Sequence, residues 1–111
     1  MYTFPKQKRL LYAHEYEATF NKGKKIFSDF FVFFYCENEF TYPRLGIVIS
    51  KKKVAKSHER QRIKRLIRES FRCRKLKNVD VIVVARHGIE NENNASLLSQ
   101  LGHVWDDLVS C

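Results

Sequence analysis

The residues most able to do chemistry in this 111-residue sequence are its lysines and arginines, because they crowd into one segment. Residues 51–77 hold thirteen of them against two acidic residues, although the net charge of the whole chain is only +9. A solvated surface normally mixes both signs of charge, so this concentration indicates a polyanionic partner. Basic side chains that neutralise phosphates release condensed counterions, which makes binding strong and steeply dependent on salt. A solvated face without a partner and an anionic membrane surface are the alternatives.

Catalytic side chains are much harder to find. Hydrolysis of a phosphodiester by protein groups requires carboxylates that hold Mg²⁺, or a pair of histidines acting as acid and base. Glu59 and Glu69 lie within the basic segment, where we expect them to form ion pairs along a helix. His58 has no second histidine near it in sequence and is expected to pack on the helix surface, while Asp106 and Asp107 belong to the acidic C-terminal part. We therefore expect no catalytic residue in this chain.

The cysteines and the apolar runs bear on where the protein works. Cys36, Cys73 and Cys111 are odd in number and widely spaced, which favours reduced thiols in a cytoplasmic protein and no zinc site. The first residues lack the apolar core of a secretory signal. The longest apolar run, residues 30–36, is far shorter than the roughly 20 residues that span a bilayer. We expect a cytoplasmic protein with no membrane segment.

Hydrophobic periodicity predicts the elements that position the basic segment. Residues 13–22 are typical of a short helix, with Tyr16 and Phe20 on the same face. The aromatic residues 26–36 and the alternating residues 44–50 favour strands, and the polar loop between them ends in proline. Tyr16 and Phe20 are thus expected to lie next to a sheet.

A second helix is predicted over residues 57–75, because the segment lacks glycine and proline and its apolar residues fall on one side. This side should pack on the sheet and leave the arginines in solvent. A buried strand over residues 80–85 and an amphipathic helix around residues 97–108 complete the pattern. The order is helix, two or three strands, helix, strand, helix, which predicts one α+β domain over residues 1–111 with a single core.

The basic segment also resembles a known signature. Residues 50–72 read SKKKVAKSHERQRIKRLIRESFR, and they resemble the stretch of the bacterial ribonuclease P protein in which a basic loop leads into an Arg-Asn-Arg helix. The similarity continues, in order and spacing, through Phe4-Pro5-Lys6, Pro43-Arg44-Leu45-Gly46 and residues 80–86. The middle of the Arg-Asn-Arg motif is Gln61 here, and its role stays open. Arg60 falls near the apolar edge of the helix, so we expect it to be partly buried and paired.

The resemblance implies both a fold and a function. The fold is an α-β sandwich of order αβββαβα, whose four-stranded sheet contains a left-handed βαβ crossover, like the second domain of a small-subunit ribosomal protein. The function is to assist a catalytic RNA in the endonucleolytic removal of 5′ leaders from precursor tRNA. The partners would be that RNA subunit and the leader, with no obligate protein partner. Mg²⁺ would act through the RNA and the substrate, and no organic cofactor is expected.

The family's site residues carry over to matching positions here. A cleft between the first helix and the sheet would receive the single-stranded leader at Tyr16 and Phe20, although ordinary core packing explains their spacing equally well. Contact with the catalytic RNA would fall to the basic loop and helix, at Lys51, Lys52, Lys53, Lys56, Arg60, Arg62, Lys64, Arg65 and Arg68.

Two other binding functions share these features. A small ribosomal protein would have a similar size and a basic helix, but it would more often carry basic tails. A DNA-binding regulator could use residues 60–72 as a recognition helix, yet evenly spread arginines are poorly suited to reading bases in a groove.

Overall fold

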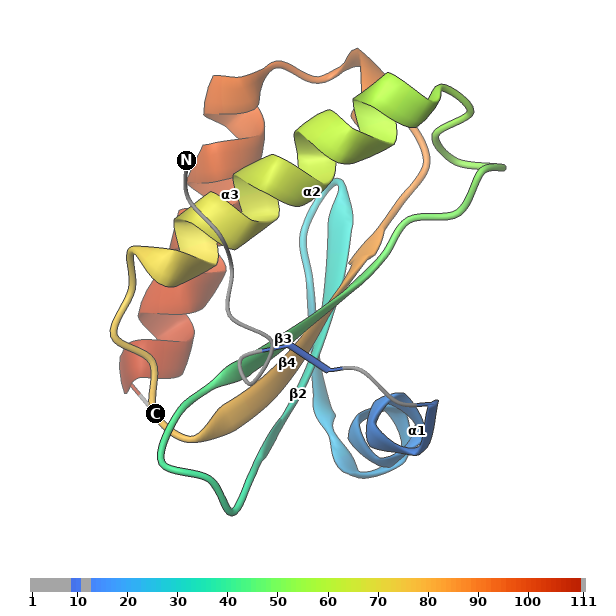
Figure 1. Ribbon diagram of the computed structural model, residues 1–111. Helices are drawn as coiled ribbons and strands as arrows, with labels where there is room; N and C mark the ends of the chain where they lie inside the picture. Colours follow the sequence, from blue (N-terminus) through green and yellow to red (C-terminus); the bar gives the residue numbers. More distant parts are fainter. Residues whose placement is uncertain (1–8, 11–12, 111) are drawn as a thin grey trace.

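The computed structural model describes residues 9–10 and 13–110 (Figure 1). Its elements follow the αβββαβα order that the family resemblance implies, with a short 3-10 helix added before the last helix. In chain order they are α1 (Ala13–Lys22), β1 (Lys24–Phe27), β2 (Phe31–Glu37), β3 (Arg44–Val48), α2 (Ser57–Arg72), β4 (Val79–Ala85), η2 (Ile89–Asn91) and α3 (Asn94–Ser110).

The aromatic run over residues 26–36, read from the sequence as one β-favouring stretch, is divided between two strands. The Ser28 hydroxyl accepts a hydrogen bond from Phe31 N at 3.2 Å, which closes a turn between β1 and β2. The Gln100 side-chain oxygen in α3 accepts further hydrogen bonds from Ser28 Oγ and Phe30 N, both at 3.1 Å. A partner some seventy residues away thus fixes this turn.

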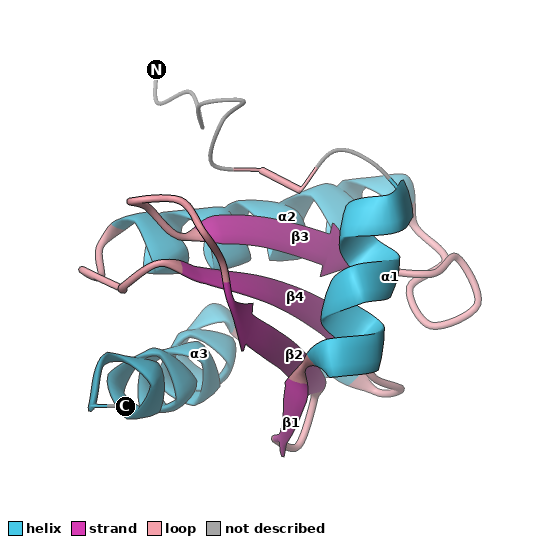
Figure 2. Ribbon diagram, turned by 90° about the horizontal axis from the view of Figure 1, so that it is seen from below, coloured by secondary structure: helices cyan, strands magenta, loops and turns pink. Residues whose placement is uncertain are grey.

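The sheet has the strand order β1-β2-β4-β3. β2 runs antiparallel to β1 and β4, whereas β3 and β4 are parallel and are joined through α2. Figures 1 and 2 show that this β3-α2-β4 crossover is left-handed. About 98% of such connections are right-handed, so hydrophobic periodicity alone would have predicted the wrong hand. The family resemblance predicted the hand correctly.

The two edge strands of the sheet, β3 and β1, differ in how they are protected. Outside β3, Arg9 forms a parallel bridge with Leu45, and Leu10 N donates to Leu45 O at 3.0 Å. At the opposite edge, β1 is four residues long and carries the exposed Lys24 and Lys25.

The helices lie on both faces of the sheet. Figure 2 shows α1 crossing the strands on one face, with α2 and α3 on the other. The main core fills the space between the sheet and α2 and α3, around the fully buried Trp105. The rings of Phe33 and Phe71 pack edge-on against it, with centroids at 5.7 and 5.4 Å, and its indole N–H donates to Ser70 Oγ at 2.8 Å. None of the described helices is long and apolar enough to cross a membrane.

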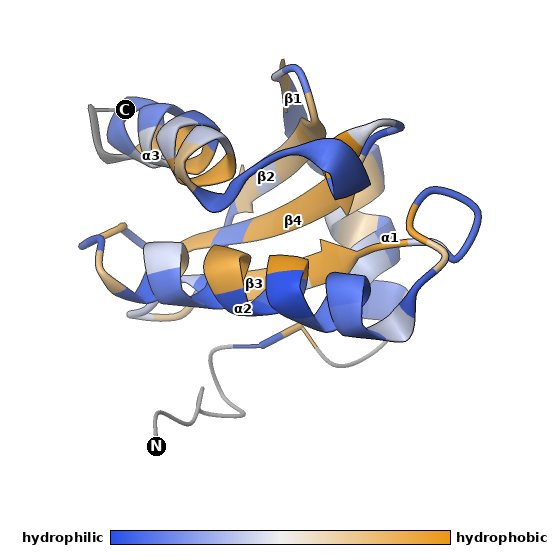
Figure 3. Ribbon diagram, turned by 90° about the horizontal axis from the view of Figure 1, so that it is seen from above, coloured by the Kyte–Doolittle hydropathy of each residue, from blue (hydrophilic) through white to orange (hydrophobic). Residues whose placement is uncertain are grey.

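α2 has the amphipathic character predicted from its sequence. Ile63, Ile67 and Phe71 follow one another at intervals of about one turn, and all three are buried. The helix ends at Arg72, three residues before the predicted end, and Cys73 N donates to Glu69 O at 3.3 Å to close the last turn. Figure 3 shows the hydrophilic residues of α2 on the side turned away from the sheet.

Replacing Ile67 by Ala tests this packing. Ile67 is fully buried, so Ile67→Ala should lower the free energy of unfolding by about 2–5 kcal/mol, measured by urea denaturation. The matched control is Leu98→Ala on α3, where a side chain 40% exposed to solvent should cost less than about 1 kcal/mol. Similar losses for the two variants would contradict the burial of this side of α2.

Candidate nucleic-acid interface

The basic residues predicted to bind RNA lie on one continuous stretch of chain, the turn after β3 and the helix α2. We call this set the basic surface. Lys51, Lys52, Lys56 and Arg65 are exposed, whereas the other five members are half-buried. Its members are Lys51, Lys52, Lys53, Lys56, Arg60, Arg62, Lys64, Arg65 and Arg68.

A compact turn holds the lysines at the start of this surface. Ser50 O accepts hydrogen bonds from Lys53 N at 3.2 Å and from Val54 N at 3.0 Å. The Val54 side chain is fully buried and anchors the turn in the core. The lysines are therefore presented from a fixed backbone.

Arg60 holds the approach to α2 in place. Its Nη1 donates to Val54 O at 3.0 Å and to Ala55 O at 2.9 Å, the carbonyls of two residues that lie just before α2 begins. The expectation that Arg60 is partly buried and paired is confirmed. The Arg60 guanidinium therefore stabilises the fold, in addition to any contact that it makes with a polyanion.

Arg62 connects α2 to the start of α3. Its Nη2 donates to Glu59 Oε2 at 2.9 Å and to Glu92 O at 3.2 Å, and its Nη1 donates to Asn94 Oδ1. The hydrogen bond from Arg62 lowers the pKa of the Glu59 carboxyl below its usual value. The sequence predicted that Glu59 would form an ion pair along the helix, and its partner is Arg62. No local pattern indicates the bonds from Arg62 to Glu92 and Asn94.

Glu69 behaves as predicted, whereas His58 is more exposed than a packed side chain would be. Glu69 forms an ion pair with Arg72 at 2.9 Å, one turn along the helix. The His58 side chain is 75% exposed, and its Nε2 lies 3.7 Å from Glu59 Oε1. Within residues 9–10 and 13–110, no group of three His, Cys, Asp or Glu side chains is placed to hold a metal ion.

Gln61, which stands where the family motif has asparagine, is exposed on the outer side of α2. It borders a hollow of about 450 Å³ between α2 and the start of α3. His58, Arg62, Arg65, Leu66 and Asn94 are the other lining residues. The longer side chain of glutamine therefore has open space around it.

On the opposite face of the sheet, Tyr16 and Phe20 both contact strands. The ring of Tyr16 lies over Gly46, where an added Cβ would come within 2.8 Å of it. Burial raises the pKa of the Tyr16 phenol above its ordinary value, and a hydrogen bond with the Ile47 backbone opposes that shift. Phe20 packs edge-on against Phe34, with ring centroids 4.7 Å apart. Both side chains stay half-buried.

A row of apolar side chains lies on the same face, and we call it the apolar strip. It consists of Phe27, Val32, Val84 and Val48, which are paired in register across all four strands. Phe27 is 65% exposed and Val48 37%, whereas Val32 and Val84 are half-buried. The next row, which includes Phe34 and Gly46, is the one that α1 covers through Phe20 and Tyr16.

The strip could have been found only in part from the sequence. Alternation along residues 30–36 separates Phe31 and Phe33, which are buried in the main core, from Val32 and Phe34 on the α1 face. The register that aligns Val32 with Val84 and Val48 depends on long-range strand pairing, which the alternation does not specify.

Comparison with known proteins gives a consistent result. The family model described as Ribonuclease P matches residues 4–109. The ribonuclease P protein component of Legionella pneumophila strain Corby is 44% identical over 111 residues, covering all of this chain and 97% of the relative. The corresponding component of Marinomonas sp. strain MWYL1 is 40% identical over 96% of this chain and 83% of its own length.

Solved structures agree with the sequence relatives. The RNase P protein of Staphylococcus aureus superposes with a TM-score of 0.85 at 30% identity, covering 92% of this chain and 97% of that one. The RNase P protein of Thermotoga maritima gives a TM-score of 0.79 at 27% identity, covering 89% and 96%. This chain therefore belongs to the ribonuclease P protein family, whose members are protein components of ribonuclease P in tRNA processing.

Proposed function

We propose that this chain binds the catalytic RNA of ribonuclease P through the basic surface and the 5′ leader of precursor tRNA through α1 and the apolar strip. The observation that carries this proposal is the pairing of two different surfaces on one small sheet. One is the cationic surface formed by α2 and the turn before it. The other is the apolar strip, which is bordered by Tyr16 and Phe20. The first suits a folded polyanion, and the second suits unstacked bases.

The two surfaces are connected through β3. Val48 ends the apolar strip on that strand, and Lys51 begins the basic surface three residues later. A single strand of RNA that lies on the apolar strip would therefore pass close to lysines that can bind its phosphates. Aromatic side chains stack on any base, so this arrangement tolerates leaders of varied sequence.

The chemical step is assigned to the RNA partner. The described side chains provide no cluster of carboxylates fit to hold Mg²⁺, so we assign the metal ions to the RNA subunit and the substrate. In the assembly, the protein raises affinity for substrate and for Mg²⁺ by neutralising RNA phosphates. We place this activity in the cytoplasm and propose no organic cofactor and no obligate protein partner.

Reconstitution tests the assignment of the chemistry. The purified chain, freed of RNA, should leave precursor tRNA uncut at any Mg²⁺ concentration. Adding it to the catalytic RNA should lower the Mg²⁺ concentration that gives half-maximal cleavage, because lysines and arginines replace part of the cation atmosphere. Gel assays of leader release across a Mg²⁺ series measure both effects. Cleavage by the protein alone would refute the assignment.

The basic surface is best tested at Lys52 and Arg65, which are exposed, rather than at Arg60 and Arg62, which also hold the fold together. Lys52→Ala and Arg65→Ala should each weaken binding of the catalytic RNA and reduce the slope of log K against log salt by about one. Lys24→Ala on β1 removes the same charge from an exposed site on another element and should leave that slope unchanged. Filter binding over a salt series distinguishes these outcomes.

Tyr16→Leu and Phe20→Leu test the leader site. Each variant keeps apolar packing but removes a stacking surface, so the holoenzyme should lose roughly 1–3 kcal/mol of affinity for precursor tRNA. Its affinity for mature tRNA, which lacks a leader, should not change. Phe71→Leu is the control, since it makes the same kind of replacement in the core on the other face of the sheet. Equal losses on both substrates would exclude a leader site at α1.

A further inference from the structure

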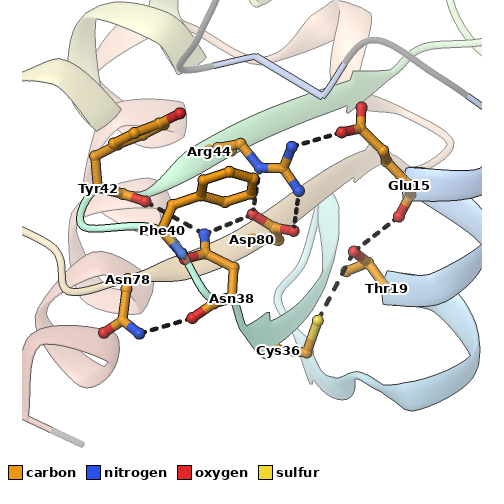
Figure 4. Close-up of polar contacts among 9 residues, drawn as sticks. All are labelled: Glu15, Thr19, Cys36, Asn38, Phe40, Tyr42, Arg44, Asn78 and Asp80. Carbon is orange, nitrogen blue, oxygen red and sulfur yellow. Dashed lines mark hydrogen bonds and ion pairs between the residues drawn. The ribbon is translucent and has the colours of Figure 1, made fainter.

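A buried ionic network links α1 to the sheet, and Arg44 is at its centre (Figure 4). The Arg44 Nε and Nη2 atoms donate to the two oxygens of Asp80 at 2.9 and 2.7 Å. Its Nη1 donates to Glu15 Oε2 at 2.5 Å. All three side chains are shielded from solvent, with exposures of 12% for Arg44, 15% for Glu15 and 8% for Asp80. Charge-assisted hydrogen bonds in such a site are strongly directional.

The sheet holds Arg44 and Asp80 without help from α1. Asn38 Nδ2 donates to Asp80 Oδ1 at 2.7 Å and to Tyr42 O at 3.2 Å, which ties the β2–β3 loop to β4. The Phe40 ring covers the Arg44 guanidinium at 4.5 Å. The hydrogen bond to Asp80, with that to Glu15, raises the pKa of Arg44. Arg44 is therefore a fixed point on the sheet.

Glu15 connects α1 to Arg44 on the sheet. It lies in the first turn of the helix and directly precedes Tyr16, whose ring rests on Gly46 of β3. Farther along α1, Thr19 lies 3.8 Å from the Cys36 sulfur, and Phe20 packs on Phe34. The latter contacts are a weak thiol hydrogen bond and a ring contact, neither of which sets the helix orientation as strictly as an ion pair.

We propose that the Glu15–Arg44 ion pair positions the leader-binding helix, so that Glu15 acts as a positioning residue for Tyr16 and Phe20. This inference rests on the proposed leader site. Removing the Glu15 carboxylate leaves Arg44 paired with Asp80, so the sheet and the main core keep their contacts. The effect falls on the placement of α1 beside the apolar strip.

The test is Glu15→Ala in the reconstituted holoenzyme. Affinity for precursor tRNA should fall about fivefold or more, because displaced Tyr16 and Phe20 rings stack less well on the leader bases. Affinity for mature tRNA should stay unchanged. The cleavage rate at saturating holoenzyme and the salt slope for the catalytic RNA should also stay unchanged. Glu15→Gln retains a neutral acceptor for Arg44 and should give an intermediate loss.

Asp106→Ala is the matched control. Asp106 also pairs with an arginine, Arg74, at 2.9 Å, but it lies on α3, on the other face of the sheet. The variant therefore removes a carboxylate and its ion pair with Arg74 on an element other than α1. Unchanged leader discrimination in Asp106→Ala shows that the loss in Glu15→Ala does not come from altered net charge. An equal loss of leader discrimination in Asp106→Ala would overturn the proposal.

Gly46→Ala provides a second, independent variant. Its methyl group would lie 2.8 Å from the Tyr16 ring and would displace the ring without altering any charge. Precursor affinity should again fall selectively. If both Glu15→Ala and Gly46→Ala lower affinity for precursor tRNA but not for mature tRNA, the placement of α1 on the sheet controls leader binding.

The outcomes separate this inference from the function on which it rests. If Tyr16→Leu and Phe20→Leu reduce leader discrimination but Glu15→Ala does not, the positioning role is wrong and the leader site remains. If Glu15→Ala weakens binding of precursor and mature tRNA equally, the positioning role is also wrong. If none of these variants changes discrimination, the leader site itself is excluded.

Discussion

The burial of one side of α2 against the sheet is the interaction on which the rest of the structure depends. Ile63, Ile67 and Phe71 lie on that side and are buried among core residues contributed by the strands and α3. Since α2 carries few acidic residues, its remaining positions must bring lysine and arginine to the surface. The same apolar contacts that stabilise the fold therefore concentrate positive charge on a rigid support.

Much of this arrangement was predictable from the sequence. Hydrophobic periodicity indicated α1, α2, β4 and α3 to within a few residues at their ends, because each element buries one side and exposes the other. Proline and polar residues marked the loop before β3 correctly. The charge distribution indicated a polyanion partner, and the resemblance over residues 50–72 indicated the family, which the comparisons confirm.

The side-chain contacts that sequence reasoning missed join residues far apart in the chain. Gln100 fixes the turn between β1 and β2, and Arg62 reaches the carbonyl of Glu92. Arg44 unites two carboxylates from different elements. No window of local sequence contains both partners of such a bond. The alignment of the apolar strip was missed for the same reason, because strand register is set by pairing across the sheet.

The bridge between Arg9 and Leu45 has a consequence for self-association. An open strand edge offers unpaired backbone groups to another chain, and it is a common starting point for aggregation. Here Arg9 and Leu10 cover the outer side of β3 at Leu45, while the strand at the opposite edge is four residues long and bears two exposed lysines. Both features oppose the addition of a strand from a second molecule, so we expect a concentrated solution of the free protein to resist strand-by-strand polymerisation.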